Sequence, residues 1–145
     1  MARRRPKLSR LHPDRSGIEV ALGDLEAAVM RIIWEADGRM SVEDVRQRLI
    51  EQGREVAYTT VMTTCSRLYH KGLLDREKVG RGYQYWPAIT EEEFARTVAQ
   101  AAIDGVLSAF SEPAVAYFVE ALSERDPRQL DLLAELIEQK RRKSP

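Results

Sequence analysis

Three helix-like segments followed directly by two strand-like segments constrain the fold of this chain most strongly. Apolar residues recur at helical spacing in residues 23–36 and 42–52, and again in residues 57–72, which end at a glycine. Residues 73–79 and 83–87 are rich in strand-forming residues and flank a Gly-Arg-Gly turn. This order predicts a winged helix-turn-helix, with the third helix as the recognition helix and the hairpin as the wing.

Three further helical segments follow the predicted hairpin. Thr90 and Asp126 are good N-cap residues, and Pro113 suits the first turn of the middle helix. Their apolar stripes are too broad for helices that pack on one side only. We therefore expect a mainly α protein in three parts. These parts are a flexible basic arm (1–20), a winged helix-turn-helix DNA-binding domain (21–88) and a three-helix domain (89–145).

Charge is divided unevenly along the chain. Residues 1–88 contain 16 Lys and Arg against 12 Asp and Glu, whereas residues 89–145 contain 7 against 11. This division indicates that only the first part meets a polyanion.

A single cysteine, Cys65, excludes an intramolecular disulfide and is typical of a reducing cytoplasm. No uninterrupted apolar run reaches 18 residues, so we expect no membrane insertion.

The third helical segment, AYTTVMTTCSRLYHKG, is unusually rich in hydroxyl groups for a helix. At about 100° per residue, its apolar side chains fall on one face, which we expect to be buried. The members of this face are Val61, Cys65, Leu68, Tyr58 and Tyr69. The opposite face carries hydroxyls, Arg67 and His70, and it carries no acid. Thr64 lies at the edge of the buried side.

A hydroxyl-rich, acid-free helix face suits the major groove of DNA. Threonine hydroxyls can bond base edges or phosphates, and threonine methyls pack on the thymine methyl. The candidate base contacts are Thr59, Thr60 and Thr63, and the candidate backbone contacts are Ser66, Arg67, Lys78 and Arg81. Further candidate contacts are Tyr58, Met62, Tyr83 and, in the arm, Arg3, Arg4 and Arg5. The alternative is that this face, the hairpin tip and the arm are merely solvated.

The sequence offers no catalytic constellation and no metal site. His12 and His70 are the only histidines, and Cys65 and His70 do not share a helix face. Cys-x-x-Cys, His-Glu-x-x-His and glycine-rich phosphate-loop motifs are absent from the sequence. We therefore predict that the protein is not an enzyme and requires no cofactor.

The segments LGDLEAAVMRIIWE (22–35) and AYTTVMTTCSRLYHKGLLDREKVGRGYQYWP (57–87) resemble the BlaI/MecI family of penicillinase and methicillin-resistance repressors. This resemblance implies a homodimer that represses transcription from a palindromic, double-stranded DNA operator. It also implies that residues 89–145 form the dimerisation domain. The candidate interface residues are Phe94, Val98, Ala102, Phe110, Phe118, Leu122, Leu133 and Ile137.

The resemblance also implies a route of induction. Known members are cleaved at an Asn-Phe bond in the dimerisation domain, downstream of a membrane sensor-protease. The matching bond is Ala109–Phe110, where alanine replaces the asparagine. The absence of cysteine after Cys65 excludes the copper-responsive branch of the family. Two alternatives remain open: a winged-helix module that binds protein without DNA, and a regulator released from DNA by a small ligand.

Overall fold

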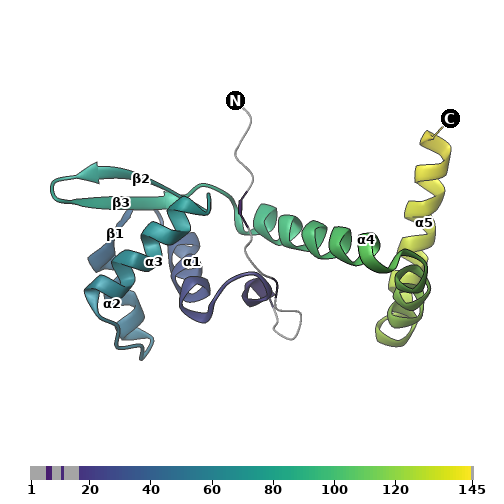
Figure 1. The fold of residues 1–145 in the computed structure, drawn as a ribbon, viewed down its shortest axis with the longest axis horizontal. Helices are drawn as coiled ribbons and strands as arrows, with labels where there is room; N and C mark the ends of the chain where they lie inside the picture. Colours follow the sequence, from purple (N-terminus) through teal and green to yellow (C-terminus); the bar gives the residue numbers. More distant parts are fainter. Residues whose placement is uncertain (1–5, 8–10, 12–16, 145) are drawn as a thin grey trace. The chain divides into compact units, whose positions relative to one another are not determined.

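The computed structural model describes residues 6, 7, 11 and 17–144 of the 145-residue chain. Arg3, Arg4 and Arg5, the candidate contacts in the arm, lie outside the described residues. The elements, labelled in Figure 1, are η1 (Gly17–Val20), α1 (Asp24–Glu35), β1 (Met40–Ser41), α2 (Val42–Glu51), α3 (Tyr58–His70), β2 (Leu74–Val79), β3 (Gly82–Pro87), α4 (Glu91–Arg125) and α5 (Pro127–Lys143). The predicted mainly α, winged helix-turn-helix class is confirmed.

Local sequence explains where α2 begins and where α3 ends. Ser41 caps α2 as predicted, because its hydroxyl accepts a hydrogen bond from the Asp44 amide while the Asp44 carboxylate accepts one from the Ser41 amide. At the end of α3, Gly72 has a φ of 86°. This left-handed conformation is accessible to glycine and stops the helix where the sequence predicted.

The wing is a two-strand hairpin extended by a third short strand. β3 lies between β2 and β1, and both pairings are antiparallel. Val79 faces Gly82 across a two-residue turn, whose first residue, Gly80, has a φ of 64°. The sequence did not predict β1, because a two-residue strand carries no periodicity. Its residue Met40 pairs with Tyr85 of β3.

A single apolar cluster joins the helices to the sheet. Val61, Cys65 and Leu68 of α3 are fully buried with residues from α1 and α2, and Tyr85 of β3 belongs to the same cluster. Burial in this cluster overrides the weak helix propensity of the threonine-rich α3. The predicted inner face of α3 is thus confirmed for these three residues. Tyr58 is 44% exposed, so its predicted burial is wrong.

The described start of the chain is more structured than a flexible arm of residues 1–20. Residues 17–20 form the 3-10 helix η1, and Ile18 is buried in the core. Leu11 packs against the same core, and the Lys7 amide donates a hydrogen bond to the Lys71 carbonyl at 2.8 Å. The predicted arm is therefore corrected over these residues, because apolar side chains within it join the core.

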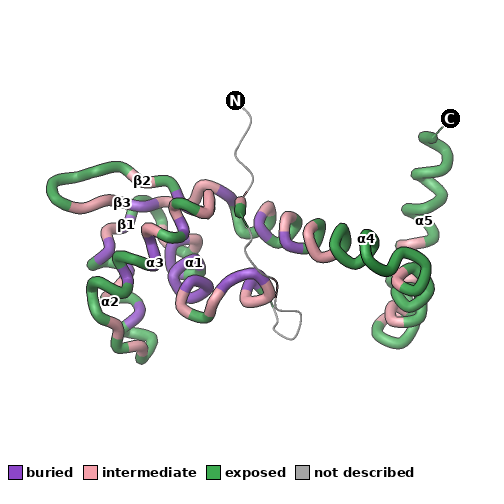
Figure 2. The backbone as a smooth tube through the Cα atoms, viewed as in Figure 1, coloured by how far each residue is buried: buried purple, intermediate pink, exposed green. Residues whose placement is uncertain are grey.

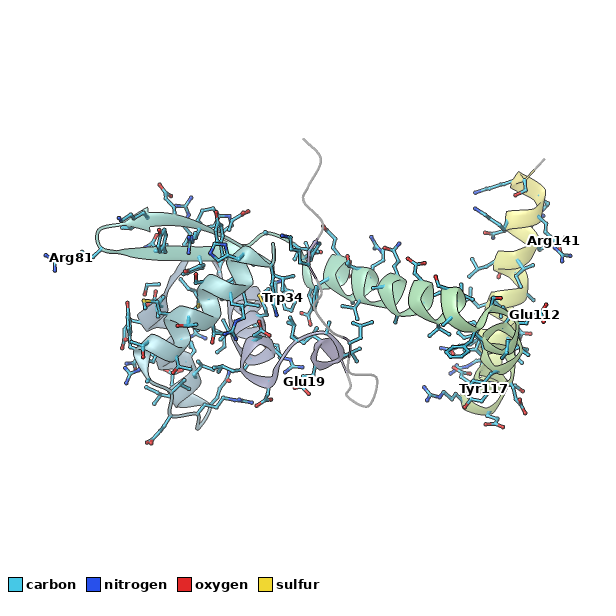
Figure 3. The ribbon with its side chains drawn as sticks, viewed as in Figure 1. Glu19, Trp34, Arg81, Glu112, Tyr117 and Arg141 are labelled. Atoms are coloured by element: carbon cyan, nitrogen blue, oxygen red, sulfur yellow. The ribbon has the colours of Figure 1, made fainter. Side chains whose placement is uncertain are left out.

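The first turns of α4 belong to the winged-helix core. The chain divides into two compact units between Gln100 and Ala101, later than the predicted boundary at residues 88 and 89. Phe94 is fully buried, with its ring centroid 5.8 Å from that of Trp34, and Val98 is 9% exposed. The Trp34 indole donates a hydrogen bond to the Ile89 carbonyl at 2.9 Å. Figure 3 shows Trp34 near the start of α4.

This packing corrects the assignment of Phe94 and Val98 to the dimer interface. Both side chains are buried within one chain, so neither offers a free apolar surface. The apolar stripe of the sequence reveals that the side chains are buried, but it does not reveal which surface covers them.

The second unit, taken alone, consists of the rest of α4 and α5. The backbone of α4 leaves helical geometry at Phe110, where φ is −143° and ψ is 52°. Pro113 explains the kink, because its ring cannot donate to the Ala109 carbonyl and collides with it. Two helical segments of α4 and α5 therefore match the three predicted helices. Asp126 caps α5 by accepting a hydrogen bond from the Arg128 amide at 3.1 Å.

Most residues of this unit are coloured as exposed in Figure 2, and most of its large apolar residues are among them. The exposed ones are Ile103, Val106, Leu107, Phe110, Val115, Tyr117, Phe118, Val119, Leu132, Leu136 and Ile137. Ala102, Leu122 and Leu133 are half-buried.

The length and composition of α4 alone would allow it to cross a membrane, with a mean hydropathy of 1.2 in its best window. The sequence prediction missed this window because it required an uninterrupted apolar run. Asp104, Glu112 and Glu120 recur along the helix, and carboxylates are costly in a bilayer. We therefore interpret the exposed apolar surface of α4 as a contact surface for protein rather than for lipid.

Candidate nucleic-acid interface

The outer face of α3 carries the predicted DNA-reading residues. Thr59, Thr60 and Thr63 are exposed, as is Arg67 one turn further along, and Ser66 is half-buried. Thr64 is 5% exposed, and its hydroxyl donates to the Thr60 carbonyl at 2.8 Å. Its placement at the buried edge is confirmed. The face therefore presents short hydroxyl side chains, with a cation towards the C-terminal end.

A groove lies on each side of this face. The first has a volume of about 510 Å³ and lies between α3 and the start of α1. It is lined by Gly23, Asp24, Leu25, Glu26, Thr59, Thr60, Thr63, Thr64 and Arg67. The second has a volume of about 490 Å³ and lies between α3 and the wing. Its lining includes Tyr58, Met62, Ser66, His70, Arg76, Arg81 and Tyr83. Thr63 and Arg67 line both grooves, so they form the ridge between them.

One of the two acids that line the first groove, Asp24, is paired with a cation from the turn before α3. Arg54 donates to both carboxylate oxygens of Asp24, at 2.9 and 3.4 Å. The hydrogen bond and the charge of Asp24 raise the pKa of Arg54. This bidentate pair leaves little net charge of its own at the groove, so Asp24 repels an approaching phosphate less than a bare carboxylate would.

The second groove is bounded by the basic wing. Lys78 and Arg81 are exposed, and neither forms an ion pair with any described residue. Figure 3 shows Arg81 at the tip of the hairpin, pointing away from the helices. Tyr83 is half-buried further down the wing. Both cations are therefore available to an anionic partner.

A partly buried ion pair fixes the C-terminal end of α3. The Lys71 ammonium lies 2.7 Å from one carboxylate oxygen of Glu26, and the other oxygen accepts a hydrogen bond from the Gly23 amide at 3.1 Å. The side chains are 18% and 11% exposed, respectively. One carboxylate thus caps α1 and holds α3 against it, which orients the outer face of α3.

The sequence interpretation missed three residues at this interface. Arg54 supports the first groove, while His70 and Arg76 line the second. His70 lay on the exposed face of the helical wheel and could have been chosen from it. Arg54 and Arg76 carried no such signal, because their partners are distant in sequence.

The described residues offer no metal site, since no three His, Cys, Asp or Glu side chains among them are grouped to hold an ion. Cys65 is fully buried, and burial raises the pKa of its thiol to about 12. The thiol is therefore protonated and unreactive at neutral pH.

Comparisons with known proteins show which proteins this chain is similar to. A model of the penicillinase repressor family matches residues 22–139. Transcriptional regulator BlaI of Mycobacterium tuberculosis (strain H37Rv) is 35% identical over 100 residues, which cover 68% of this chain and 72% of that protein. Methicillin resistance regulatory protein MecI of Mammaliicoccus sciuri is 28% identical over 102 residues, covering 68% and 79%. A chain in the complex structure of hsRosR-S1 is 22% identical, with a TM-score of 0.44 and coverage of 75% and 95%.

Proposed function

From the membership of this chain in the penicillinase repressor family, we propose that this transcriptional repressor binds a palindromic promoter operator as a homodimer. The observation that carries the proposal is the acid-free outer face of α3, exposed between two grooves and flanked by a basic wing. The family consists of transcriptional regulators rather than enzymes. We also propose that the repressor acts in the cytoplasm, where a bacterial promoter lies.

In this proposal, α3 enters the major groove with its first two turns nearest the bases. Thr59, Thr60 and Thr63 read base edges, because the N-terminal residues of a recognition helix make these contacts. Arg67 and Ser66 bind phosphate and set the register of the helix. Lys78 and Arg81 bring the wing against the neighbouring backbone. The candidate contacts Tyr58 and Met62 border the second groove, where they can pack against sugar or base.

The homodimer is supported by the exposed apolar surface of the second unit. Phe110, Phe118 and Ile137 are 65%, 50% and 45% exposed, and they belong to a surface larger than scattered single residues would produce. A second copy that covers this surface would also bury the half-buried Ala102, Leu122 and Leu133. Since a twofold dimer presents two recognition helices, its operator should be a palindrome.

We further propose that cleavage at Ala109–Phe110 releases the repressor. The exposure of Phe110 and the break in its helix support this position, because proteases cut extended, accessible backbone. A membrane sensor-protease encoded nearby would be the partner. Mass spectrometry of induced cells should find a fragment beginning at Phe110, and an intact chain under full induction would contradict cleavage.

Fluorescence anisotropy tests the DNA-binding proposal. The chain is titrated onto a duplex from its own upstream region and onto a scrambled duplex of equal composition, at 50 to 200 mM salt. We expect selectivity of about 10³-fold or more, and affinity that falls steeply with salt. Equal affinity for both duplexes would refute sequence-specific repression and would favour the protein-interaction module.

Two substitutions on the ridge between the grooves distinguish base contact from phosphate contact. Thr63→Ala should reduce the preference for the operator over the scrambled duplex, because it removes a base contact. Arg67→Ala should weaken binding to both duplexes to a similar degree and reduce the salt slope by about 2, because a homodimer loses one phosphate contact in each protomer. Wild-type behaviour of both variants would show that another face of α3 meets DNA.

A further inference from the structure

Arg76 on β2 lies between two aromatic rings from different elements. Its guanidinium carbon is 4.0 Å from the ring centroid of Tyr69, on α3, and 4.0 Å from that of Tyr83, on β3. Both distances lie within the range of cation–π attraction, which favours arginine because its planar group stacks on rings. The side chain of Arg76 therefore connects the recognition helix to both strands of the wing.

The buried residue Tyr85 adds a third contact. Tyr85 stands opposite Arg76 in the strand register and is 1% exposed, and the interaction between its phenol and the guanidinium raises the pKa of Arg76 against the effect of burial. Burial raises the pKa of Tyr85, although the interaction with Arg76 opposes that rise. The phenol therefore stays neutral and anchors the guanidinium to the core.

These contacts distinguish Arg76 from the other cations of the wing. Lys78 and Arg81 are exposed, whereas Arg76 is half-buried and has both faces of its guanidinium covered. A phosphate could approach only the edge of that group. The charge of Arg76 thus serves contacts within the protein.

The position of Arg76 gives these contacts a consequence for DNA binding. Arg76 lines the groove between α3 and the wing, together with Arg67 on one side and Arg81 on the other. If α3 lies in the major groove, the DNA backbone must pass between the helix and the wing. The separation of Arg67 and Arg81 then decides whether both reach phosphate together.

We propose that Arg76 is a positioning residue that holds the wing at a fixed angle to α3 and so aligns Arg81 with the DNA backbone. This inference rests on the proposed function. Arg76→Lys keeps the positive charge but removes the planar group that stacks between the rings. Tyr69→Leu keeps every cation and removes one side of the stack, so it provides an independent perturbation of the same contact.

A double-mutant cycle with Arg81→Ala tests the inference on the full-length protein and its operator. Arg76→Lys and Tyr69→Leu should each weaken operator binding about tenfold in the wild-type background. In the Arg81→Ala background each should weaken it less than threefold, because there is no tip contact left to align. Arg81→Ala should lower the salt slope of the homodimer by about 1.8, about 0.9 for each protomer. Arg76→Lys should lower the slope in the wild-type background but not in the Arg81→Ala background, because it withdraws Arg81 from its phosphate. Tyr69→Phe, which keeps the ring, is the control and should bind like the wild type.

Each other outcome overturns the inference. Equal losses in both backgrounds would mean that Arg76 acts independently of the wing tip, through stability of the fold. A wild-type salt slope for Arg76→Lys would mean that its loss of affinity does not pass through the phosphate contact of Arg81. If Arg81→Ala bound normally while the wild type remained selective, the wing would have no contact to align. Absence of selective binding by the wild type would refute the proposed function itself.

Discussion

Substitution of Phe94 should separate the stability of the winged-helix unit from that of the dimer. Phe94 is fully buried and packs beside Trp34, whereas Phe110 in the same helix is 65% exposed. Replacing a buried phenylalanine with alanine costs about 3–5 kcal/mol through lost burial and an unfilled cavity. Phe94→Ala should therefore lower the melting temperature of this unit by about 12 °C or more. Phe110→Ala is the matched control, because it removes the same atoms from an exposed site.

Differential scanning calorimetry at several protein concentrations measures both effects. The cost of Phe94→Ala should not depend on concentration, because the side chain packs within one chain. Phe110→Ala should have its main effect on the concentration dependence of melting, which reports the dimer. Equal costs for the two variants at the lowest concentration, or a cost for Phe94→Ala that vanishes on dilution, would refute the assignment of Phe94 to the intramolecular core.

Three further substitutions test contacts within the winged-helix unit. Glu26→Gln should lower the free energy of unfolding by about 1–3 kcal/mol in urea titrations, because it leaves the partly buried Lys71 ammonium without its charged partner; an unchanged midpoint would contradict this. Cys65→Ala should flatten the loss of stability at high pH. Because burial raises the thiol pKa from 9.0 to about 12, the unfolded thiol ionises first, and stability should fall by up to about 1.4 kcal/mol per pH unit between these values. Identical pH profiles of wild type and variant would exclude this contribution. Ser41→Ala should cost about 1 kcal/mol, measured in urea, by removing the cap of α2; no change would mean that the cap contributes nothing.

The sequence was most informative where structure depends on local contacts. The spacing of Val61, Cys65 and Leu68 predicted the inner face of α3, and Gly72 predicted its end. The helical wheel placed Tyr58 on the buried face because it assumes that every turn of the helix contacts the core. The first turn of α3 extends past the core, so this ring is half-exposed and borders the groove beside the wing.

Features that depend on distant residues could not be read from the sequence. The apolar spacing in α4 is the same whether Phe94 packs on Trp34 or on another chain, so only the structure distinguishes the two. Likewise, Arg76 reads as one more cation of the wing until Tyr69 and Tyr83 are placed on either side of it. The strand at Met40 is too short to produce a pattern, and α2, α3 and β2 separate it in sequence from its partner Tyr85.

A hydroxyl-radical footprint of the protein on its own upstream DNA tests whether a homodimer reads a palindromic operator through α3. We expect two protected half-sites on one face of the duplex, related by a dyad and separated by about 34 Å or a multiple of that distance. Both half-sites should appear at the same protein concentration, since one dimer carries both recognition helices. A single protected half-site, or uniform protection with no preferred sequence, would contradict a homodimer that reads a palindrome with α3.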